Sequence, residues 1–428
     1  MSPRSAPGGA APPGPAHLDP GELSRVDLAD PALLASDRRY AVWDQLRRHR
    51  PVHWQPVADA GTARGFWSVT RYEDVNRVLA DHVCFTSERG TLLNLLGRRD
   101  PAAGQQMAAT DPPRHDRMRL PVQRAMSASS ARRYVQDVTA GVRALLADHA
   151  AGGSFDAATV LAGLPLVVVG PLLGVPVADW PDLTRLAGMC TAEDDPAYQL
   201  PEGAEATLRR GHRELFAYFT DLARQRARRG GEDLVSLLLR MEVDGEPLGR
   251  GSVVSNCYSL LLGASVTLPH VPAAALAHLA GTDRYARWAH RPDLLTSGVE
   301  EALRWASPAS HFMRVARRPV DLSGVTVAAG EAVVAWLGSA NRDPAVFAHP
   351  DEFDVRRAPN RHLAFGAGRH YCIGSHLARL ALRLFFAELF ATFESLTPDG
   401  EPVRVRSTFL SGYQRLPLVG WPRRRDDS

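Results

Sequence analysis

The chain has 428 residues, of which 45% are hydrophobic and 23% are charged, and its formal net charge is +3. These values are ordinary for a globular protein, and so small a positive charge does not favour nucleic-acid binding. The four cysteines, Cys84, Cys190, Cys257 and Cys372, lie far apart without zinc-finger spacing, which indicates a reducing, cytoplasmic setting without disulfides.

The first twenty residues differ in composition from the rest of the chain. Residues 1–20 are rich in Pro, Ala and Gly and contain no long apolar run. They are predicted to be disordered, and they resemble neither a signal peptide nor a membrane anchor. Residues 21–428 contain no repeat and no linker-like stretch, so we expect one domain there, without membrane attachment.

Helical periodicity dominates the chain. Residues 65–70 are typical of a short strand, and residues 71–81 of a helix. Apolar residues recur at helical spacing over 132–151, 205–229, 252–280, 294–305 and 377–393. Between residues 320 and 334, β-branched residues alternate with glycines, which predicts short strands and turns. The predicted fold class is mainly α with small β-sheets.

The most informative stretch runs from Phe365 to Gly374, where Cys372 lies among glycines and just before a helix-forming run. Glycines allow tight turns that bring backbone N–H groups near the sulfur. A helix that begins after Cys372 places its positive end near the sulfur and favours the thiolate. Such a thiolate suits the axial position on haem iron, where it promotes O–O cleavage. For an isolated cysteine, a small buried side chain beside a turn is the plainer alternative.

The order Phe-Gly-x-Gly-x-His-x-Cys-x-Gly in this stretch resembles the haem-binding signature of the cytochrome P450 superfamily. The resemblance extends from about residue 30 to residue 422. It implies the P450 fold, haem b with Cys372 as the axial ligand of its iron, and monooxygenase activity.

Further positions match motifs of that family. Glu301-x-x-Arg304 with Arg357 resembles a buried cluster whose role is structural, and on the resemblance it locks the cysteine loop. His115 and Arg119, one helical turn apart, resemble a pair that contacts the haem propionates. The resemblance extends haem contact to Arg314, His370, Ala264, Phe365 and Gly374. Taken singly, each charged residue among these is more typical of a solvated surface.

The segment from Gly263 to Thr267 resembles the family pattern Ala/Gly-Gly-x-Asp/Glu-Thr. Thr267 matches the catalytic hydroxyl that bonds dioxygen, but Val266 replaces the acid. We expect protons to come through water, a substrate group, Ser265 or His270, unless Val266 simply packs in the core. Pro269 should kink the helix and free the carbonyl of Ser265.

By resemblance, the substrate pocket draws on residues 86–105, 190–205, 309–312 and 409–412 and on the distal helix. Its predicted lining is Ser265, Val266, Ser310, His311, Phe312, Phe409 and Leu410. The aromatic and leucine side chains would supply apolar surface, while Ser310 and His311 would orient the substrate.

No convincing Gly-x-Gly-x-x-Gly motif follows a strand, so electrons should arrive from a separate ferredoxin and its reductase. Candidate docking residues for the ferredoxin are Arg114, Arg117, Arg124 and Arg369. We expect a monomer that oxidises a small molecule, free or carrier-bound, in bacterial secondary metabolism. The alternatives are oxidative coupling or desaturation and, more remotely, a non-catalytic haem sensor or electron carrier.

Overall fold

The computed structural model describes residue 23, residues 25–58 and residues 61–423. The segment 1–20, predicted to be disordered, lies outside these residues, and the division into two parts at residue 21 stays a prediction. The α-helices are α2 Pro31–Ala35, α3 Arg38–His49, α4 Tyr72–Ala80, α5 Arg114–Ala125, α6 Ala128–Ala131, α7 Val135–Ala147, α8 Ala157–Ala162, α9 Leu164–Leu173, α10 Trp180–Thr191, α11 Ala204–Arg229, α12 Leu234–Leu239, α13 Arg250–Ser265, α14 His270–Leu279, α15 Asp283–Ala289, α16 Leu295–Ala306, α17 Leu337–Ala340 and α18 Ser375–Thr392.

The strands are β1 Val52–Pro56, β2 Gly65–Val69, β3 Phe85–Thr86, β4 Gly153–Asp156, β5 Glu242–Val243, β6 Glu246–Pro247, β7 His311–Ala316, β8 Val320–Leu322, β9 Val325–Val327, β10 Ala332–Trp336, β11 Phe393–Pro398, β12 Val403–Arg404, β13 Tyr413–Arg415 and β14 Pro417–Pro422. The predicted class, mainly α with small sheets, is confirmed. The strands expected near residues 65 and 320–334 are present as β2 and as β8 to β10.

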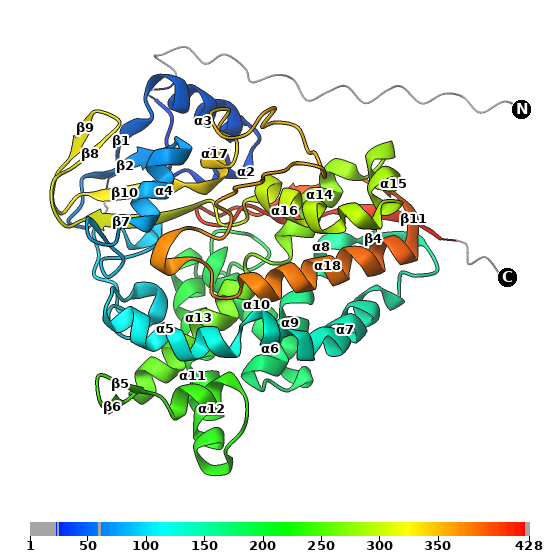
Figure 1. Cartoon of the computed structure of the whole chain (residues 1–428), viewed down its shortest axis with the longest axis horizontal. Helices are drawn as coiled ribbons and strands as arrows, with labels where there is room; N and C mark the ends of the chain where they lie inside the picture. The colour runs from blue at the N-terminus through cyan, green and yellow to red at the C-terminus, as the bar shows by residue number, and fades with distance from the viewer. Residues whose placement is uncertain (1–22, 24, 59–60, 424–428) are drawn as a thin grey trace, which may run out of the picture.

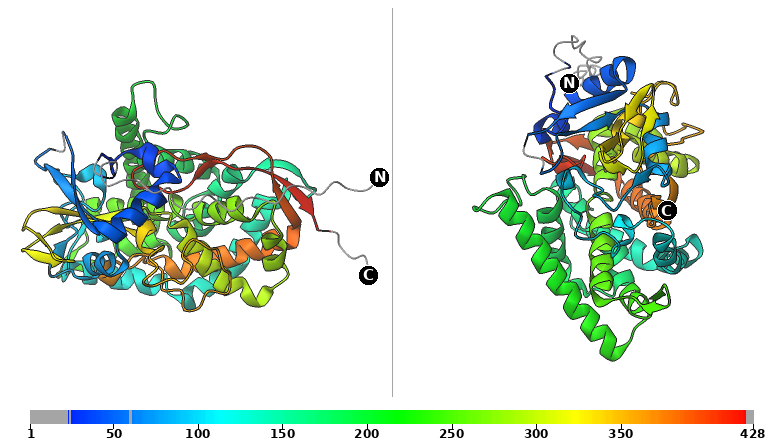
Figure 2. Two further views of the ribbon diagram at one scale, coloured as in Figure 1. Left: turned by 90° about the horizontal axis from the view of Figure 1, so that it is seen from above. Right: turned by 90° about the vertical axis from the view of Figure 1, so that its left-hand side faces the viewer.

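The largest sheet has five strands in the order β1-β2-β10-β7-β3. Strands β10 and β2 run parallel, and the other neighbouring pairs run antiparallel. This sheet lies to one side with α3, α4 and α17, whereas α13 and α18 run through the helical bulk (Figure 1). The long helix α11 flanks that bulk on its outer side (Figure 2). Strand β7 follows helix α16 in the chain and belongs to this sheet, and it carries residues of the candidate site.

The helix predicted over residues 252–280 is present as two helices, α13 and α14, so the interruption expected at Pro269 is present, but it separates two helices by a turn instead of kinking one. Proline has no N–H, so Pro269 cannot continue the helical ladder. The bonds tighten instead: the Thr267 N–H donates to Ala264 at 3.4 Å, and the His270 N–H donates to Thr267 at 3.2 Å. Thr267 therefore lies in the turn between the helices.

Among the described residues, the segment Arg250–Leu279 is long and apolar enough to cross a membrane by length and composition. Within the protein, however, 56% of its most apolar window is buried. A central helix that packs on all sides needs the same apolar composition as a membrane span. Its hydropathy is therefore explained by its position in the core.

Candidate functional site

The loop that carries Cys372 is shaped by two glycines with left-handed backbone. Gly366 has φ 71° and Gly368 has φ 67°. A Cβ on Gly368 would lie 2.5 Å from the Cα of Ala80, so glycine lets the loop pack against α4. The loop closes where the Cys372 N–H donates to the Phe365 carbonyl at 2.8 Å. Cys372 is therefore presented by a compact turn that leads directly into α18.

Opposing influences act on the Cys372 thiol. Burial raises its pKa, while the N–H groups of Gly374 and Ser375 and the charges of Arg119 and Arg379 lower it, and burial prevails. The thiol therefore needs a further positive charge to ionise fully. A metal ion bound to the sulfur would supply that charge, because a coordinated thiol loses its proton.

The described residues contain no group of three or more His, Cys, Asp or Glu side chains placed to hold a metal ion. A single thiolate such as that of Cys372 suits an iron whose other ligands come with its cofactor, as the porphyrin of haem provides them. The donor set around Cys372 therefore fits haem.

The four residues predicted to contact the propionates converge from three elements. We call this set, His115 and Arg119 on α5, Arg314 on β7 and His370 on the 3₁₀ turn Gly368–His370, the cationic cluster. The ring centroids of His115 and His370 are 4.3 Å apart. Nε2 of His115 is buried and has no hydrogen-bond partner within the described part of the chain. Because a buried polar atom without a partner is costly, the cluster fits an anionic group that would bond to it.

The charges of the cluster support the same fit. Burial, followed by the charges of Arg314, His115 and Arg119, lowers the pKa of His370 to about 2. Burial also lowers the pKa of Arg314 to about 10, although Asp111 opposes the shift. Burial thus keeps the two histidines neutral, and the positive charge of the cluster comes from Arg119 and Arg314. Two carboxylates of a bound cofactor would neutralise it.

Thr267 and the small residues before it lie at the end of α13. The Thr267 hydroxyl donates to the Gly263 carbonyl at 2.8 Å. Gly263 is exposed, and a Cβ placed on it would meet no atom within 4 Å. Ala264 and Ser265 are half-buried. This face of α13 therefore borders open space, where a flat cofactor could approach the backbone closely.

Val266 points into a small apolar cluster. It is 5% exposed and packs with Ala192, Val405 and Leu410. These partners come from the loop after α10 and from the C-terminal part of the chain. The position that carries an acid in the family pattern is thus filled by a core side chain.

The two other groups considered as proton sources differ in their surroundings. His270 accepts the Tyr413 N–H at Nδ1, at 3.3 Å, and burial lowers its pKa to about 4. It is therefore neutral at physiological pH. The hydroxyl of Ser265 is buried and has no partner within the described residues. Because Nδ1 accepts, the proton of the neutral ring is on Nε2, so His270 and Ser265 each keep a group that can donate to a water or a substrate.

Residues 309–312 and 407–411, which we call the pocket wall, are joined by backbone bonds. The Ser310 N–H donates to Phe409 at 2.7 Å, and Ala309 forms a bridge with Leu410. The rings of Phe312 and Phe409 lie 5.9 Å apart. The structure thus brings together segment 309–312 and a segment that overlaps residues 409–412, the two parts that the sequence assigns to one pocket.

His311 has a different environment from the one expected of a substrate contact. It is fully buried, and both of its ring nitrogens lie within bonding distance of backbone groups of other segments. Neither nitrogen is left to orient a substrate.

The predicted Glu301–Arg304–Arg357 cluster is assembled and almost fully buried. Glu301 pairs with Arg304 at 2.8 Å and with Arg357 at 3.1 Å. Burial opposes ionisation of Glu301, but the two guanidinium groups hold its pKa below the ordinary value. Arg304 also donates to three carbonyl oxygens, those of Asn341, Pro350 and Glu352. The cluster fastens α16 to the long segment that precedes the cysteine loop.

The sequence reasoning missed a second network beside this cluster. Glu300 pairs with Arg379 at 2.7 Å and with His362 at 3.1 Å. Burial opposes ionisation, but His362 and Arg379 lower the pKa of Glu300 to about 2. The Arg379 guanidinium lies 4.6 Å from the ring centroid of Phe365. In the sequence, the signal for this network is the position of Arg379, one helical turn after the cysteine loop.

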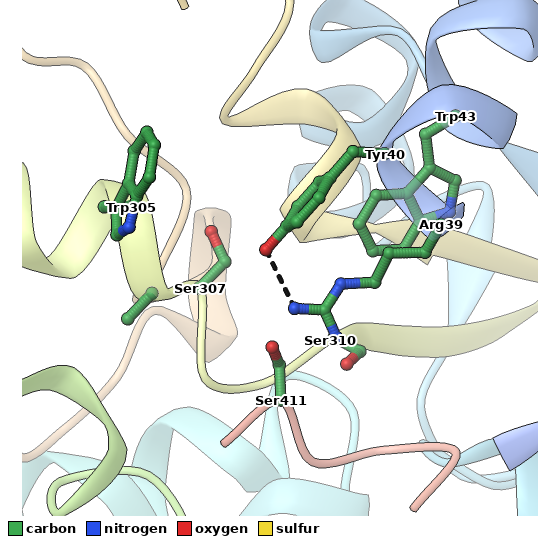
Figure 3. Close-up of a pocket in the computed structure, with 9 residues that line it drawn as sticks. Arg39, Tyr40, Trp43, Trp305, Ser307, Ser310 and Ser411 are labelled. Carbon is green, nitrogen blue, oxygen red and sulfur yellow. Dashed lines mark hydrogen bonds between the residues drawn. The ribbon is translucent and has the colours of Figure 1, made fainter. Parts of the chain in front are cut away.

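A small polar cavity lies behind the pocket wall (Figure 3). Ser310 and Ser411 border it on one side and Arg39 and Tyr40 of α3 on the other. Arg39 Nη2 donates to the Tyr40 hydroxyl at 2.8 Å, the bond drawn in Figure 3. Arg342 stacks on the Tyr40 ring at 4.1 Å. The cavity thus brings one buried arginine, Arg39, together with the phenol of Tyr40.

Three of the four arginines considered for partner docking have internal partners. Asp244 pairs with Arg114 at 2.5 Å and with Arg117 at 2.6 Å, and Asp116 pairs with Arg369 at 3.0 Å. Arg124 is exposed. Their positive charge is therefore partly neutralised within the chain.

Comparison with known proteins gives concordant matches. The family model for Cytochrome P450 matches residues 275–416. Cytochrome P450 NovI from Streptomyces niveus is 35% identical over 406 residues, which cover 94% of this chain and 98% of that protein. Linalool 8-monooxygenase from Pseudomonas putida is 30% identical over 413 residues, covering 94% of this chain and 100% of that protein.

Solved structures agree with these matches. P450 OxyD, which is involved in the biosynthesis of vancomycin-type antibiotics, has a TM-score of 0.83 and 33% identity, covering 93% of this chain and 100% of OxyD. P450BioI, in complex with an acyl carrier protein ligated with hexadec-9Z-enoic acid, has a TM-score of 0.79 and 26% identity. That match covers 91% of this chain and 100% of P450BioI.

Proposed function

The chain belongs to the cytochrome P450 superfamily and is a haem-dependent monooxygenase, and from this premise we propose that it hydroxylates or epoxidises a small organic molecule in bacterial secondary metabolism. Haem bound through a cysteine thiolate supplies oxygen activation. The observation that carries the proposal is the arrangement of the Cys372 turn, the cationic cluster and the open face of α13 at Gly263.

Each part of this arrangement has a task in the proposed reaction. Cys372 would hold the iron, and the cationic cluster would bind the propionates. Phe365, Gly374 and Ala264 would border the cofactor. Thr267 would turn its hydroxyl from the Gly263 carbonyl toward the open space beside it and would help to deliver protons there.

The names of relatives support a role in secondary metabolism. OxyD is involved in the biosynthesis of an antibiotic, and its structure resembles this chain over nearly its whole length. The structure of P450BioI with a loaded carrier protein supports the further proposal that the substrate here is carrier-bound. The pocket wall, with Phe312 and Phe409, would supply an apolar surface for either kind of substrate.

Oxidative coupling or desaturation is the second candidate, and the observation behind it is the packing of Val266 in place of the usual acid. Such a reaction takes the same two protons and two electrons per dioxygen as hydroxylation, so these protons also need a route that avoids this position. The position of the usual acid holds Val266, which has no carboxyl group and is enclosed by Ala192, Val405 and Leu410. Protons would then enter through water near Ser265 or through the substrate itself.

Electrons would come from a separate ferredoxin and reductase, and the enzyme would act as a cytoplasmic monomer. Since Arg114, Arg117 and Arg369 have internal partners, the ferredoxin would compete with Asp244 and Asp116 for them. Ionic strength should therefore affect reduction strongly.

Reduction under carbon monoxide tests the assignment of the iron ligand. The purified protein should show the red-shifted Soret band of a thiolate-bound haem, and Cys372→Ser should lose it. Cys257→Ser is the control, because that buried cysteine lies in α13 and should leave the band unchanged. A retained band in Cys372→Ser would refute the assignment.

Comparative mass spectrometry of the host with the gene intact and deleted tests the reaction. A compound that accumulates on deletion and differs from the lost product by one oxygen atom supports the monooxygenase proposal. A difference of two hydrogens, or a joining of two molecules, supports desaturation or coupling instead.

A further inference from the structure

His311 connects two segments that are distant in sequence. Its Nε2 lies 3.0 Å from the backbone N of Leu93, and its Nδ1 lies 3.2 Å from the carbonyl oxygen of Thr408. An N–H can only donate and a carbonyl oxygen can only accept, so the two bonds select the neutral tautomer with its proton on Nδ1.

Each partner belongs to a segment assigned to the substrate pocket. Leu93 opens the 3₁₀ turn Leu93–Leu95, in the long loop between β3 and α5. Thr408 lies in segment 407–411 of the pocket wall, which is bonded to the other segment, 309–312, at Ser310, directly before β7. His311 therefore stands where the loop, the wall and β7 meet.

We propose that His311 is a positioning residue that holds the loop at Leu93 and the wall at Thr408 in one arrangement, and thereby sets how closed the substrate pocket is. The inference deepens the proposed function and rests on it for the location of the pocket. The bonds themselves do not depend on that function.

The surroundings of the ring explain why histidine is suited to this task. Trp336 and Phe409 lie against it, with ring centroids 5.2 Å and 5.9 Å away. Burial lowers the pKa of His311 to about 4, the bond to Thr408 opposes this shift, and no charged group of the described residues contributes. The ring therefore stays neutral at physiological pH, and both bonds persist.

The far end of the same loop is held by another buried side chain. Asn256 of α13 accepts the Met107 N–H at 2.9 Å and donates to the Gln105 carbonyl at 3.0 Å. The start of the loop has a backbone bond, from Met313 N–H to Thr91 at 2.8 Å. Between these points, the Gly97 carbonyl accepts bonds from the N–H and the hydroxyl of Thr62, and the Gly104 carbonyl accepts one from Arg114. His311 therefore fixes the loop locally, at Leu93.

The test compares haem-loaded variants that break and that restore the bonds. His311→Phe removes both bonds and keeps a planar ring, whereas His311→Gln keeps one donor and one acceptor. His278→Phe is the matched control, since burial also lowers the pKa of His278 to about 4, but its ring packs on Trp305 and Phe353, outside the wall and the loop.

A second pair of variants removes the donor instead of the ring. Leu93→Pro deletes the N–H at the first position of a 3₁₀ turn, where proline is tolerated, and the preceding residue is already extended, with φ −125° and ψ 153°. Leu93→Ala keeps the N–H and loses a similar part of the side chain, so the difference between the two variants reports the bond.

Two measurements test the proposal. Hydrogen exchange of the peptide containing Leu93 should be about tenfold faster in His311→Phe than in the wild type, as expected for a lost buried hydrogen bond. The dissociation constants of imidazole and 4-phenylimidazole would be measured by the Soret shift. In His311→Phe, the ratio of these two constants should differ by about tenfold from the ratio in the wild type. His311→Gln should restore both values toward those of the wild type, and Leu93→Pro should reproduce the effects of His311→Phe.

Several outcomes would overturn the proposal. One is unchanged exchange at Leu93 in both His311→Phe and Leu93→Pro. Another is faster exchange that is equal throughout the chain, or equal in His278→Phe, because it would reflect lost stability alone. A ratio of the two affinities that stays constant would show that His311 does not set the closure of the pocket. If neither probe shifts the Soret band in any protein, the haem assignment fails instead, and exchange at Leu93 still decides the bond.

Discussion

The Thr267 hydroxyl donates a hydrogen bond to the Gly263 carbonyl at 2.8 Å, across the last turn of α13. Pro269 interrupts the ladder just beyond, so Thr267 lies in a turn and Gly263 faces open space. The hydrogen bond to Gly263 thereby holds the Thr267 hydroxyl at the edge of that space. It can exchange this bond for one to a ligand at modest cost, about 1 kcal/mol.

Thr267→Ala should therefore uncouple oxygen consumption from product formation. The variant loses the only hydroxyl at this position, and we expect product yield to fall by about 10²-fold while hydrogen peroxide rises. Peroxide and product would be quantified per electron supplied. Thr267→Ser, which keeps the hydroxyl, should retain most of the coupling, and equal loss in both variants would count against the role of the hydroxyl.

Val266→Glu should destabilise the protein rather than restore a proton relay. The new carboxyl group would be buried among Ala192, Val405 and Leu410 without a partner, at a cost of about 3 kcal/mol. Because this cluster adjoins Thr267, uncoupled oxygen consumption should also increase. Val266→Thr, which has nearly the same shape and no charge, should lose less stability. Thermal unfolding and peroxide yield measure the two effects, and a Glu variant identical to the parent in both would show that the acid position is unimportant.

Glu301→Gln should lower both stability and haem content. The substitution leaves the buried Arg304 without its carboxylate partner, and breaking such a pair costs about 3–5 kcal/mol. Denaturant unfolding and the ratio of haem to protein would be measured. Glu205→Gln removes an exposed pair with Arg209 and should change stability by less than about 0.5 kcal/mol. Similar effects of the two substitutions would contradict a locking role for the buried cluster.

Gly368→Ala should impair haem binding more than Gly366→Ala. Both glycines have positive φ, so both substitutions carry the strain of about 1 kcal/mol that an L-residue meets there. Only at Gly368 would the new Cβ collide with α4, at 2.5 Å from Ala80, whereas at Gly366 it meets nothing within 4 Å. The extra overpacking cost is about 1–3 kcal/mol. Haem occupancy and unfolding temperature test the order, and equal losses would contradict it.

Tyr40 should ionise near neutral pH. Burial alone would raise its pKa, but Arg39, Arg342 and Arg404 lower it from 10.0 to about 7. Because the pKa is lower in the folded state, the stabilising contribution is complete above about pH 10 and is lost as the pH falls through 7. Tyr40→Phe should abolish this pH dependence of unfolding, together with one phenolate absorbance step in a pH titration. Tyr285→Phe is the control, since burial raises the pKa of Tyr285. A titration unchanged by Tyr40→Phe would refute the assignment.

Features that depend on short-range order could be predicted before the structure was known. The spacing around Cys372, the pair of residues one turn apart in α5, and the Glu301-x-x-Arg304 motif all place side chains within one turn or one helical face, where local geometry is nearly invariant. Helical periodicity likewise predicted most of the long helices, and it failed at the turn before Pro269 because apolar spacing continues on both sides of the break.

Contacts between groups that are distant in sequence became visible only in the folded protein. The sequence predicts that His311 is a polar residue of the pocket, but in the structure its two ring nitrogens bond to the backbone of Leu93 and Thr408. Val266 became a core residue because two remote segments close over it, and Arg114 and Arg117 acquired Asp244 as a partner from the β5–β6 hairpin. Such contacts depend on how helices and loops pack after they form, and packing follows shape and charge across the whole molecule, which no local pattern encodes.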